Sequence, residues 1–257
     1  MAPADTVRGN STWGDFVWCD LSSRRLDIAC QFYAQLFGWQ YETLQAADGS
    51  DYIVGANAAE PVAGLYTMPE KFQNMGMPCF WMSYIAVQSI DQAVANGAEH
   101  GGKVELGPLD WGDGSRVALI RDPLGAGFTV VEGGAFSARN DQPQHGGMAW
   151  NGLYVSDAEV VIPFYRRLFN WQISPHKTHA AHYDIANSEG KRISSIHELP
   201  EALRGKEQYW AIQFTVDDMA NARETVIGAG GDYQNMGDGS AIVRDPDNAS
   251  FFLTAKV

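Results

Sequence analysis

The chain has 257 residues, of which 45% are hydrophobic, and a formal net charge of −13. This length predicts one or two domains with a sizeable buried core. The acidic balance disfavours nucleic-acid and membrane partners, because phosphate backbones and anionic lipids repel negative charge and the sequence has no cluster of Lys and Arg. No apolar run approaches the roughly 18 residues that span a bilayer, and no signal segment is recognisable, so we expect a cytoplasmic protein.

Three cysteines, Cys19, Cys30 and Cys79, show no CxxC motif and no pairing with histidine at zinc-finger spacing. Neither a disulfide framework nor a structural zinc site is therefore indicated. We interpret them as buried thiols.

The sequence repeats itself. Trp18–Leu21 recurs as Trp150–Leu153, and Phe32–Trp39 recurs as Phe164–Trp171. Two later pairs of segments match in the same order: Trp81–Val87 with Trp210–Val216, and Ala118–Pro123 with Ala241–Pro246. The spacing between copies shrinks along the chain, which indicates a duplication followed by loop deletions in the second copy.

A Gly- and Pro-containing polar stretch without hydrophobic period separates the two copies. We predict a first domain over 11–134, a linker over 135–146 and a second domain over 147–257. Within each half the pattern is a short strand, an amphipathic helix and several short strands, and it occurs twice.

The first helix of each half is the clearest element. Apolar residues between Leu26 and Phe37 recur every three or four positions, and Gly38 can end this helix in the left-handed conformation. Its counterpart covers Ala158–Phe169, with Asp157 as the N-cap. Pro163 must then lie near the first turn or kink the helix.

The second helix of each half begins after a capping residue, Ser89 or Asp217, and ends toward a Gly-Gly pair. Strands follow both helices. Those at Arg116–Ile120 and Ala241–Val243 stop at an Asp-Pro turn, and the closing strands are Phe128–Val131 and Phe251–Thr254.

These features resemble the vicinal-oxygen-chelate superfamily, which includes glyoxalases, bleomycin resistance proteins and extradiol dioxygenases, and among them the two-domain glyoxalase-like type. The motifs that carry the resemblance are the fourfold strand–helix–strands pattern, the Phe-Tyr-x-x-Leu-Phe-x-Trp helix end and the Arg-Asp-Pro turn. It implies an α+β fold of two tandem domains. Each would consist of paired βαβββ modules that form a cup-shaped mixed sheet with the helices outside.

Catalytic members of this superfamily hold a divalent metal on the concave face with His, Glu or Gln. The resemblance places those ligand positions on residues that are neither His nor carboxylates: Trp18, Met82, Thr129, Trp150, Ala211 and Phe252. A divalent ion needs three or four converging donors. We therefore expect no cofactor and no metal at these positions, with a divalent metal bound elsewhere as the alternative.

Strand alternation places a set of aromatic and polar residues on the expected concave faces, with Trp111 as a loop residue that could cover the first cup. The candidate ligand-binding residues are Trp18, Met82, Tyr84, Trp111, Thr129, Trp150, Tyr154 and Gln213. Asp20, two residues after Trp18, is the candidate acid–base group because desolvation would raise its pKa. The alternative is that these residues fill a closed core.

Four histidines lie in the second half: His176, His179, His182 and His197. Their spacing invites a metal interpretation. On a strand, however, a spacing of three places neighbours on opposite faces, so we favour solvated histidines.

The sequence thus favours a metal-free superfamily member that binds a small, partly aromatic or hydrophobic molecule. A cationic cargo of the bleomycin type would suit the acidic surface. The alternatives are a lyase, isomerase or hydroxylase of the same superfamily, and a non-catalytic structural domain with plugged cups. Because the duplication can replace a dimer, we expect a monomer or weak homodimer.

Overall fold

The computed structural model describes residues 13–45, 49–57, 60–111, 114–134, 140–205 and 208–256. The first half contains β1 (Phe16–Ser23), α1 (Leu26–Phe37), β2 (Gln40–Gln45), β3 (Asp51–Asn57), β4 (Glu60–Thr67), α2 (Glu70–Asn74), β5 (Phe80–Ala86), α3 (Ile90–Glu99), β6 (Lys103–Asp110), β7 (Ser115–Arg121) and β8 (Gly127–Gly133). The second half contains β9 (Met148–Val155), α4 (Ala158–Phe169), β10 (Gln172–Pro175), β11 (His182–Ala186), β12 (Arg192–Glu198), a 3₁₀ turn (Glu201–Leu203), β13 (Tyr209–Val216), α5 (Met219–Gly228), β14 (Asp232–Asn235), β15 (Ser240–Arg244) and β16 (Ser250–Ala255).

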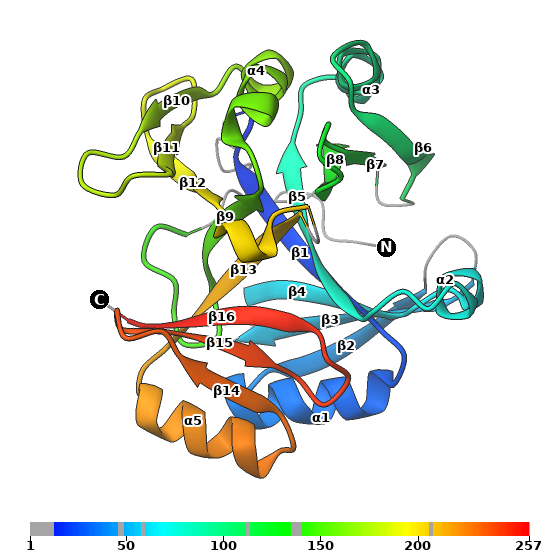
Figure 1. Cartoon of the computed structure of the whole chain (residues 1–257). Coiled ribbons are helices and arrows are strands. Elements are labelled where there is room, and N and C mark those ends of the chain that lie inside the picture. The colour runs from blue at the N-terminus through cyan, green and yellow to red at the C-terminus, as the bar shows by residue number, and fades with distance from the viewer. Residues whose placement is uncertain are drawn as a thin grey trace. The chain divides into compact units, whose positions relative to one another are not determined.

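In the described residues the strands form two mixed eight-stranded sheets, with the orders β2-β3-β4-β1-β5-β8-β7-β6 and β10-β11-β12-β9-β13-β16-β15-β14. The opening strand of a module pairs in parallel with its closing strand in β1·β4, β5·β8 and β13·β16, whereas the hairpins are antiparallel. This confirms the α+β class and the paired βαβββ modules (Figure 1). No helix in the described ranges is long and apolar enough to cross a membrane.

The helix ends agree with the sequence at three of four expected caps. Gly38 has φ 71°, Asp157 accepts a hydrogen bond from the Glu159 N–H, and Ser89 accepts one from the Gln92 N–H. The expected cap Asp217 is wrong by one residue. Asp218 accepts from the N–H groups of Ala220 and Asn221, while the Asp217 N–H donates to His145 Nδ1.

The local structure bears on two further expectations. Pro163 lies inside α4, beyond the first turn, where the missing N–H removes one intrahelical bond. The three cysteines are free thiols; Cys19 and Cys79 are buried and Cys30 is half-buried.

The chain divides into two compact units, and each unit draws on both halves of the sequence. The described parts of 19–83, 140–154 and 208–257 form one unit, which we call the α1–α5 unit. The described parts of 1–18, 84–139 and 155–207 form the other, which we call the α3–α4 unit. The names reflect the helix pairs that pack together in each.

In the α1–α5 unit, aromatic side chains of the first-half helix pack against second-half strands. Tyr33 is fully buried and its ring centre lies 5.6 Å from Phe251 and 5.4 Å from Trp81. Phe37 lies 5.2 Å from Phe214 of β13. This contact buries the apolar stripe of α1 that the sequence predicts.

The α3–α4 unit repeats this packing with the halves exchanged. Tyr165 of the second-half helix α4 is fully buried and lies 5.7 Å from Phe128 of the first-half strand β8. Trp171, just after α4, stacks on Tyr165 at 5.5 Å. Each helix stripe is therefore covered by the closing strand of a module from the other half.

Candidate functional site

Asp20 lies in the middle of β1 and is 1% exposed. In the α1–α5 unit, β1 runs parallel to β4, with Asp20 opposite Gly64 and Ser22 opposite Tyr66. Residues opposite one another on paired strands, and residues two apart on one strand, share a face of the sheet. Asp20, Ser22 and Tyr66 therefore share one face.

Tyr52 joins this face from β3, because it is the partner of Tyr66 in the antiparallel β3·β4 pair. The two phenol rings stack at 6.5 Å with an interplanar angle of 18°. A Cβ atom on Gly64 would overlap the Tyr52 hydroxyl, so this phenol occupies the space beside Asp20 that a side chain at 64 would fill. Glycine at this position is what allows the phenol to lie there.

The electrostatics fit a carboxylate close to a phenol. Burial raises the pKa of Tyr66, and the charge of Asp20 raises it further, whereas the nearby Ser22 hydroxyl opposes the shift. Ser22 is 1% exposed, and its Oγ makes no hydrogen bond of ordinary geometry within the described residues. We call Asp20, Ser22, Tyr52 and Tyr66 the β1–β4 polar cluster. It provides one carboxylate, two phenols and one hydroxyl with unused hydrogen-bonding capacity.

Met82 and its neighbour on β5 point to opposite faces of the sheet. Trp81 donates its indole N–H to the Tyr33 hydroxyl at 3.1 Å and so faces the helix core, as its parity predicts. Met82, half-buried, therefore faces away from α1. Contact of Met82 with a ligand stays a prediction.

The remaining first-half candidates belong to the α3–α4 unit. Tyr84 and Thr129 are opposite one another in the parallel β5·β8 pair, and both are 6% exposed. Trp18 is half-buried on β1. Trp111 is half-buried after β6, and its backbone N–H donates to the Ser115 carbonyl at 2.9 Å. Ligand contact by these residues stays a prediction.

The second-half candidates allow a test of the superfamily's metal position. Gln213 of β13 is opposite both Trp150 of β9 and Phe252 of β16, so an indole, an amide and a phenyl ring share one face. Only the amide offers an oxygen donor, and a divalent ion needs at least three converging donors. These residues do not fit a metal centre.

The same face carries an aromatic stack in the α1–α5 unit. The Tyr154 ring is parallel to Tyr209 at 5.3 Å and to Phe252 at 5.6 Å, with interplanar angles of 13° and 10°. Burial raises the pKa of Tyr154, and Tyr209 and Asp238 add to this effect. The phenol of Tyr154 is therefore neutral over the whole physiological range.

The four second-half histidines are arranged differently from our expectation. Their rings lie next to one another, with centre-to-centre distances of 5.0 Å (His176–His179), 5.5 Å (His179–His182) and 4.4 Å (His182–His197). Strand alternation does not separate them, because residues 176–181 form a loop and β11 begins at His182.

Sequence reasoning includes Asp20 in the candidate site but misses Ser22, Tyr52 and Tyr66. Ser22 has the same parity as Asp20, which is a signal that could have found it. The two tyrosines come to Asp20 through strand pairings that a single sequence does not specify. The local signal for them is Gly64, a glycine inside a strand, which often marks a close approach of another group.

Comparison with known sequences matches each half of the chain to a protein family. Residues 16–130 match the glyoxalase/bleomycin resistance protein/dioxygenase superfamily, and residues 152–254 match a glyoxalase-like domain. The chain belongs to the glyoxalase/bleomycin resistance protein/dioxygenase superfamily and carries two such domains in tandem.

Two relatives of similar length extend the match over most of the chain. "Putative glyoxylase CFP32" of Mycobacterium tuberculosis is 28% identical over 243 residues, covering 91% of this chain and 92% of that protein. "Anthracycline biosynthesis protein DauV" of Streptomyces sp. (strain C5) is 25% identical over 230 residues, covering 85% and 82%.

Solved structures share the fold. The Mn(II)-bound glyoxalase from Novosphingobium aromaticivorans superposes with a TM-score of 0.64 at 16% identity, covering 95% of this chain and 83% of that one. The 2,2',3-trihydroxybiphenyl 1,2-dioxygenase of Sphingomonas wittichii RW1 gives 0.61 at 11% identity, covering 95% and 91%.

Proposed function

We propose that the chain binds a small, partly aromatic molecule on the face that carries the β1–β4 polar cluster, without a metal at the superfamily's usual positions. The observation that carries this proposal is the buried Ser22 hydroxyl, whose contact with Tyr66 falls short of ordinary hydrogen-bond geometry, next to a buried carboxylate and two phenols. Buried polar groups in native proteins are almost always paired, so a ligand group is a natural partner.

The chemistry of the cluster defines the ligand. A carboxylate accepts hydrogen bonds, whereas a serine hydroxyl both donates and accepts. The stacked rings of Tyr52 and Tyr66, together with the thioether of Met82, supply apolar and aromatic surface. We therefore expect a flat ring system that carries at least one hydroxyl. The similarity to DauV, named as an anthracycline biosynthesis protein, makes hydroxylated polycyclic aromatics the first class to test.

The test uses tryptophan fluorescence titration of the full chain with 1,8-dihydroxyanthraquinone and, as a matched probe, anthraquinone without hydroxyls. We expect saturable binding of the dihydroxy probe and at least about fivefold weaker binding of the other, because a lost hydrogen bond to a buried polar group costs about 1–3 kcal/mol. Asp20→Asn and Ser22→Ala should each weaken binding by a similar factor. Asp27→Asn, on the exposed surface of α1, is the control.

Gly64→Ala provides an independent variant, because the added methyl must displace the Tyr52 phenol. Gly228→Ala, where a Cβ meets no atom within 4 Å, is its control. Equal affinity of all variants for the dihydroxy probe, or no saturable binding to the wild-type chain, would refute the proposal.

A second function, a lyase, isomerase or hydroxylase activity with Asp20 as acid–base group, is favoured by the burial of this carboxylate beside a phenol. Mass spectrometry of the probe after incubation distinguishes the two functions. An unchanged mass and retention time support binding alone, whereas a product that Asp20→Asn fails to form supports catalysis.

A further inference from the structure

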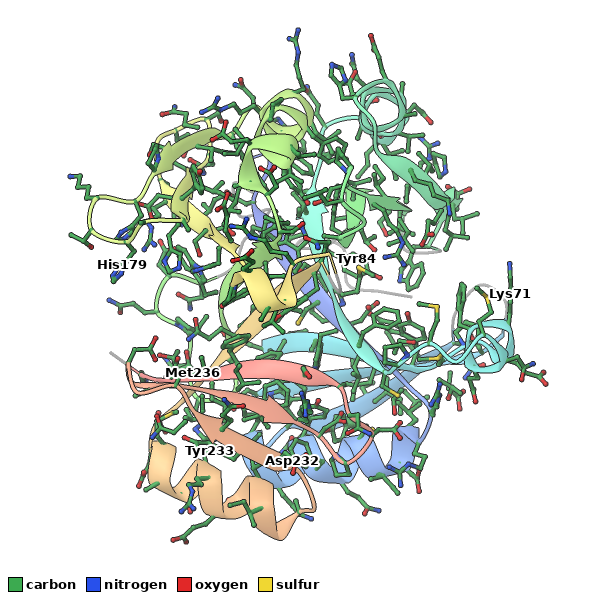
Figure 2. The ribbon with its side chains drawn as sticks, viewed as in Figure 1. Lys71, Tyr84, His179, Asp232, Tyr233 and Met236 are labelled. Carbon is green, nitrogen blue, oxygen red and sulfur yellow. The ribbon has the colours of Figure 1, made fainter. Side chains whose placement is uncertain are left out.

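A group of histidines belongs to the α3–α4 unit, whereas the β1–β4 polar cluster belongs to the α1–α5 unit, and these histidines have no role in the proposed function. His182 of β11 and His197 of β12 are directly opposite in an antiparallel pair, so their side chains share one face. Their ring centres are 4.4 Å apart, and His179 lies 5.5 Å from His182. Figure 2 shows His179 on the loop between β10 and β11.

These separations are those of imidazoles that share a metal ion. With metal–nitrogen bonds of about 2.0–2.1 Å, two rings on one tetrahedral ion have centres about 5 Å apart. A histidine pair across two strands is held at this separation by the sheet itself. His179 adds a third ring from an exposed position, where its side chain can turn.

His176 has a structural role in the same loop. Its Nδ1 accepts hydrogen bonds from the backbone N–H of Thr178 at 3.3 Å and of His179 at 3.2 Å, and its backbone N–H donates to the His182 carbonyl at 2.8 Å. With Nδ1 as acceptor, the neutral ring carries its proton on Nε2, which then cannot bind a metal. His176 is therefore a positioning residue that folds the loop so that His179 lies beside His182.

The turn into β11 is strained in a way that supports a function for this loop. Ala181 has φ 61°, the left-handed region that residues with a Cβ rarely adopt, and its carbonyl accepts a hydrogen bond from the Glu198 N–H at 2.9 Å. Such strain persists where surrounding contacts impose it, and it concentrates at binding sites. Here the residue in this conformation directly precedes His182, which pairs with His197 in the register of β11 and β12.

The two paired imidazoles, His182 and His197, differ in their surroundings. Burial lowers the pKa of His197 to about 4, with further lowering by His182, Arg192 and His176 against an opposing effect of Asp184. Burial and the neighbouring His179 and His176 lower the pKa of His182. His197 Nε2 lies 2.8 Å from the Ser195 hydroxyl, so a metal bound at this nitrogen would replace that hydrogen bond.

We propose that His179, His182 and His197 bind one late first-row divalent cation, Zn²⁺, Ni²⁺ or Cu²⁺, at a site distinct from the superfamily's metal position. Imidazole is a preferred ligand for these ions. No three His, Cys, Asp or Glu side chains converge on one point within the described residues, so binding must turn at least one ring. The exposed side chain of His179 is the one with room to move.

The experiment is calorimetric titration of the tag-free full chain with Zn²⁺ at pH 7.5. We expect one ion per chain and micromolar or tighter affinity. His179→Ala and His182→Ala should each weaken binding more than about tenfold. His100→Gln should leave it unchanged, because His100 is the C-cap of α3 and its Nδ1 lies against the Asn96 carbonyl. Thermal melting of each variant shows whether it is folded, and His179→Ala, in an exposed loop, is expected to retain the wild-type melting temperature.

A spectrum of the Cu²⁺-loaded chain provides a second readout. Electron paramagnetic resonance should show coupling to at least two nitrogens, with fewer in His182→Ala. Weak binding of several Zn²⁺ ions that is unchanged in His179→Ala and His182→Ala would overturn the proposal, as would a Cu²⁺ spectrum without nitrogen coupling. Because the β1–β4 polar cluster is untouched by these variants, dihydroxyanthraquinone binding should be the same in all of them.

Discussion

The Tyr33 hydroxyl donates a hydrogen bond of 2.9 Å to Asp245 Oδ2, which joins the first helix of the chain to the turn before its last strand. The repeat contains the same relationship, because the Tyr165 hydroxyl donates to Asp122 Oδ2 at 3.0 Å. Both phenols are fully buried. These are the Tyr of the Phe-Tyr-x-x-Leu-Phe motif and the Asp of the Arg-Asp-Pro turn, so the two repeated motifs bind each other across the halves of the sequence.

Removal of the Tyr33 hydroxyl should destabilise the folded chain. In Tyr33→Phe, the Asp245 carboxylate loses a donor and the Trp81 indole N–H loses its acceptor, at a cost of about 2–3 kcal/mol. Burial already raises the pKa of Asp245, against hydrogen bonds from the Ala249 N–H and Tyr33, so the variant should raise it further. Thermal unfolding checks this. Tyr233→Phe, which alters a half-buried phenol of β14, should change stability by less than about 0.5 kcal/mol.

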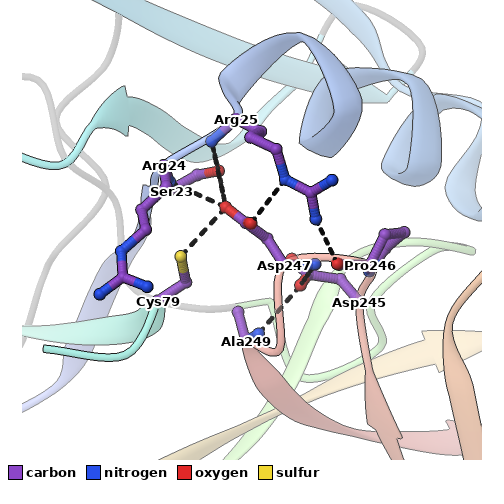
Figure 3. A network of polar contacts seen from close by, with 8 residues as sticks. All are labelled: Ser23, Arg24, Arg25, Cys79, Asp245, Pro246, Asp247 and Ala249. Atoms are coloured by element: carbon purple, nitrogen blue, oxygen red, sulfur yellow. Dashed lines mark hydrogen bonds and ion pairs between the residues drawn. The ribbon is translucent and has the colours of Figure 1, made fainter. Parts of the chain in front are cut away.

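Asp247 should matter more than an ordinary surface carboxylate. Its Oδ2 accepts from the Ser23 hydroxyl and from the backbone N–H of Arg24 and Arg25, at the start of α1, while Oδ1 pairs with the Arg25 guanidinium at 2.9 Å (Figure 3). Asp247→Asn should cost about 2 kcal/mol. Asp91→Asn breaks the exposed ion pair with Arg116 and should cost at most about 0.5 kcal/mol. Equal losses in chemical denaturation would contradict this view of the network.

The same residue predicts how stability depends on pH. Although burial acts to raise it, hydrogen bonds from Cys79, Arg25, the Arg24 N–H and Ser23 hold the pKa of Asp247 well below its ordinary value of 3.8. Its contribution to the free energy of unfolding is therefore complete above about pH 4 to 5 and is lost as the pH falls toward the folded-state pKa. Urea melts between about pH 6 and pH 2.5 should show a shallower decline in Asp247→Asn than in the wild type.

The thiols should be slow to react in the folded chain. Burial, with Asp27 nearby, raises the pKa of Cys30 to about 11, and burial with a hydrogen bond to Asp247 raises that of Cys79 to about 12. Burial also raises the pKa of Cys19. The thiolate is the reactive form of a cysteine. Modification of the folded chain by a disulfide reagent at pH 7.5 should therefore be about a hundredfold slower than modification of the chain denatured in guanidinium. One fast thiol in the native chain would disprove this.

Each half of the chain should fail to fold alone as a monomer. The α1 stripe is covered by Phe214 and Phe251, and the α4 stripe by Phe128, so a separated half exposes one aromatic stripe. Residues 1–139 and 140–257, expressed separately, should aggregate or self-associate, and their co-expression should give a 1:1 complex. Sedimentation velocity measures both outcomes. A monomeric half with cooperative unfolding would show that a half does not need the packing of its helix on strands of the other half.

The sequence is sufficient to predict the four modules. It does not predict that the first helix of each half packs on strands of the other half. The repeat of Phe32–Trp39 as Phe164–Trp171, with strand alternation around Leu21 and Leu153, predicts four βαβββ units, and the structure confirms them. The partner of each helix cannot be predicted, because Phe128 and Phe251 are equivalent in the repeat and either would satisfy the same apolar stripe. Composition and periodicity do not distinguish two packings with equal burial.

For the candidate site, too, the sequence predicts one part and misses another. Asp20 follows from alternation along one strand, which is local information. Tyr52 reaches it only through the registers of β1·β4 and β3·β4, which are set by the whole sheet. Strand geometry misplaces the histidines, because His176 and His179 lie in a loop that His176 itself folds.

The interleaving of the halves also changes how stability depends on concentration. Two unlinked halves would assemble in a bimolecular step, and dilution would separate them. The peptide bond between the halves makes the same association intramolecular, and such tethering typically corresponds to an effective concentration in about the millimolar range. The melting temperature of the intact chain should thus be independent of its concentration, so that one polypeptide keeps both compact units assembled at the lowest expression level.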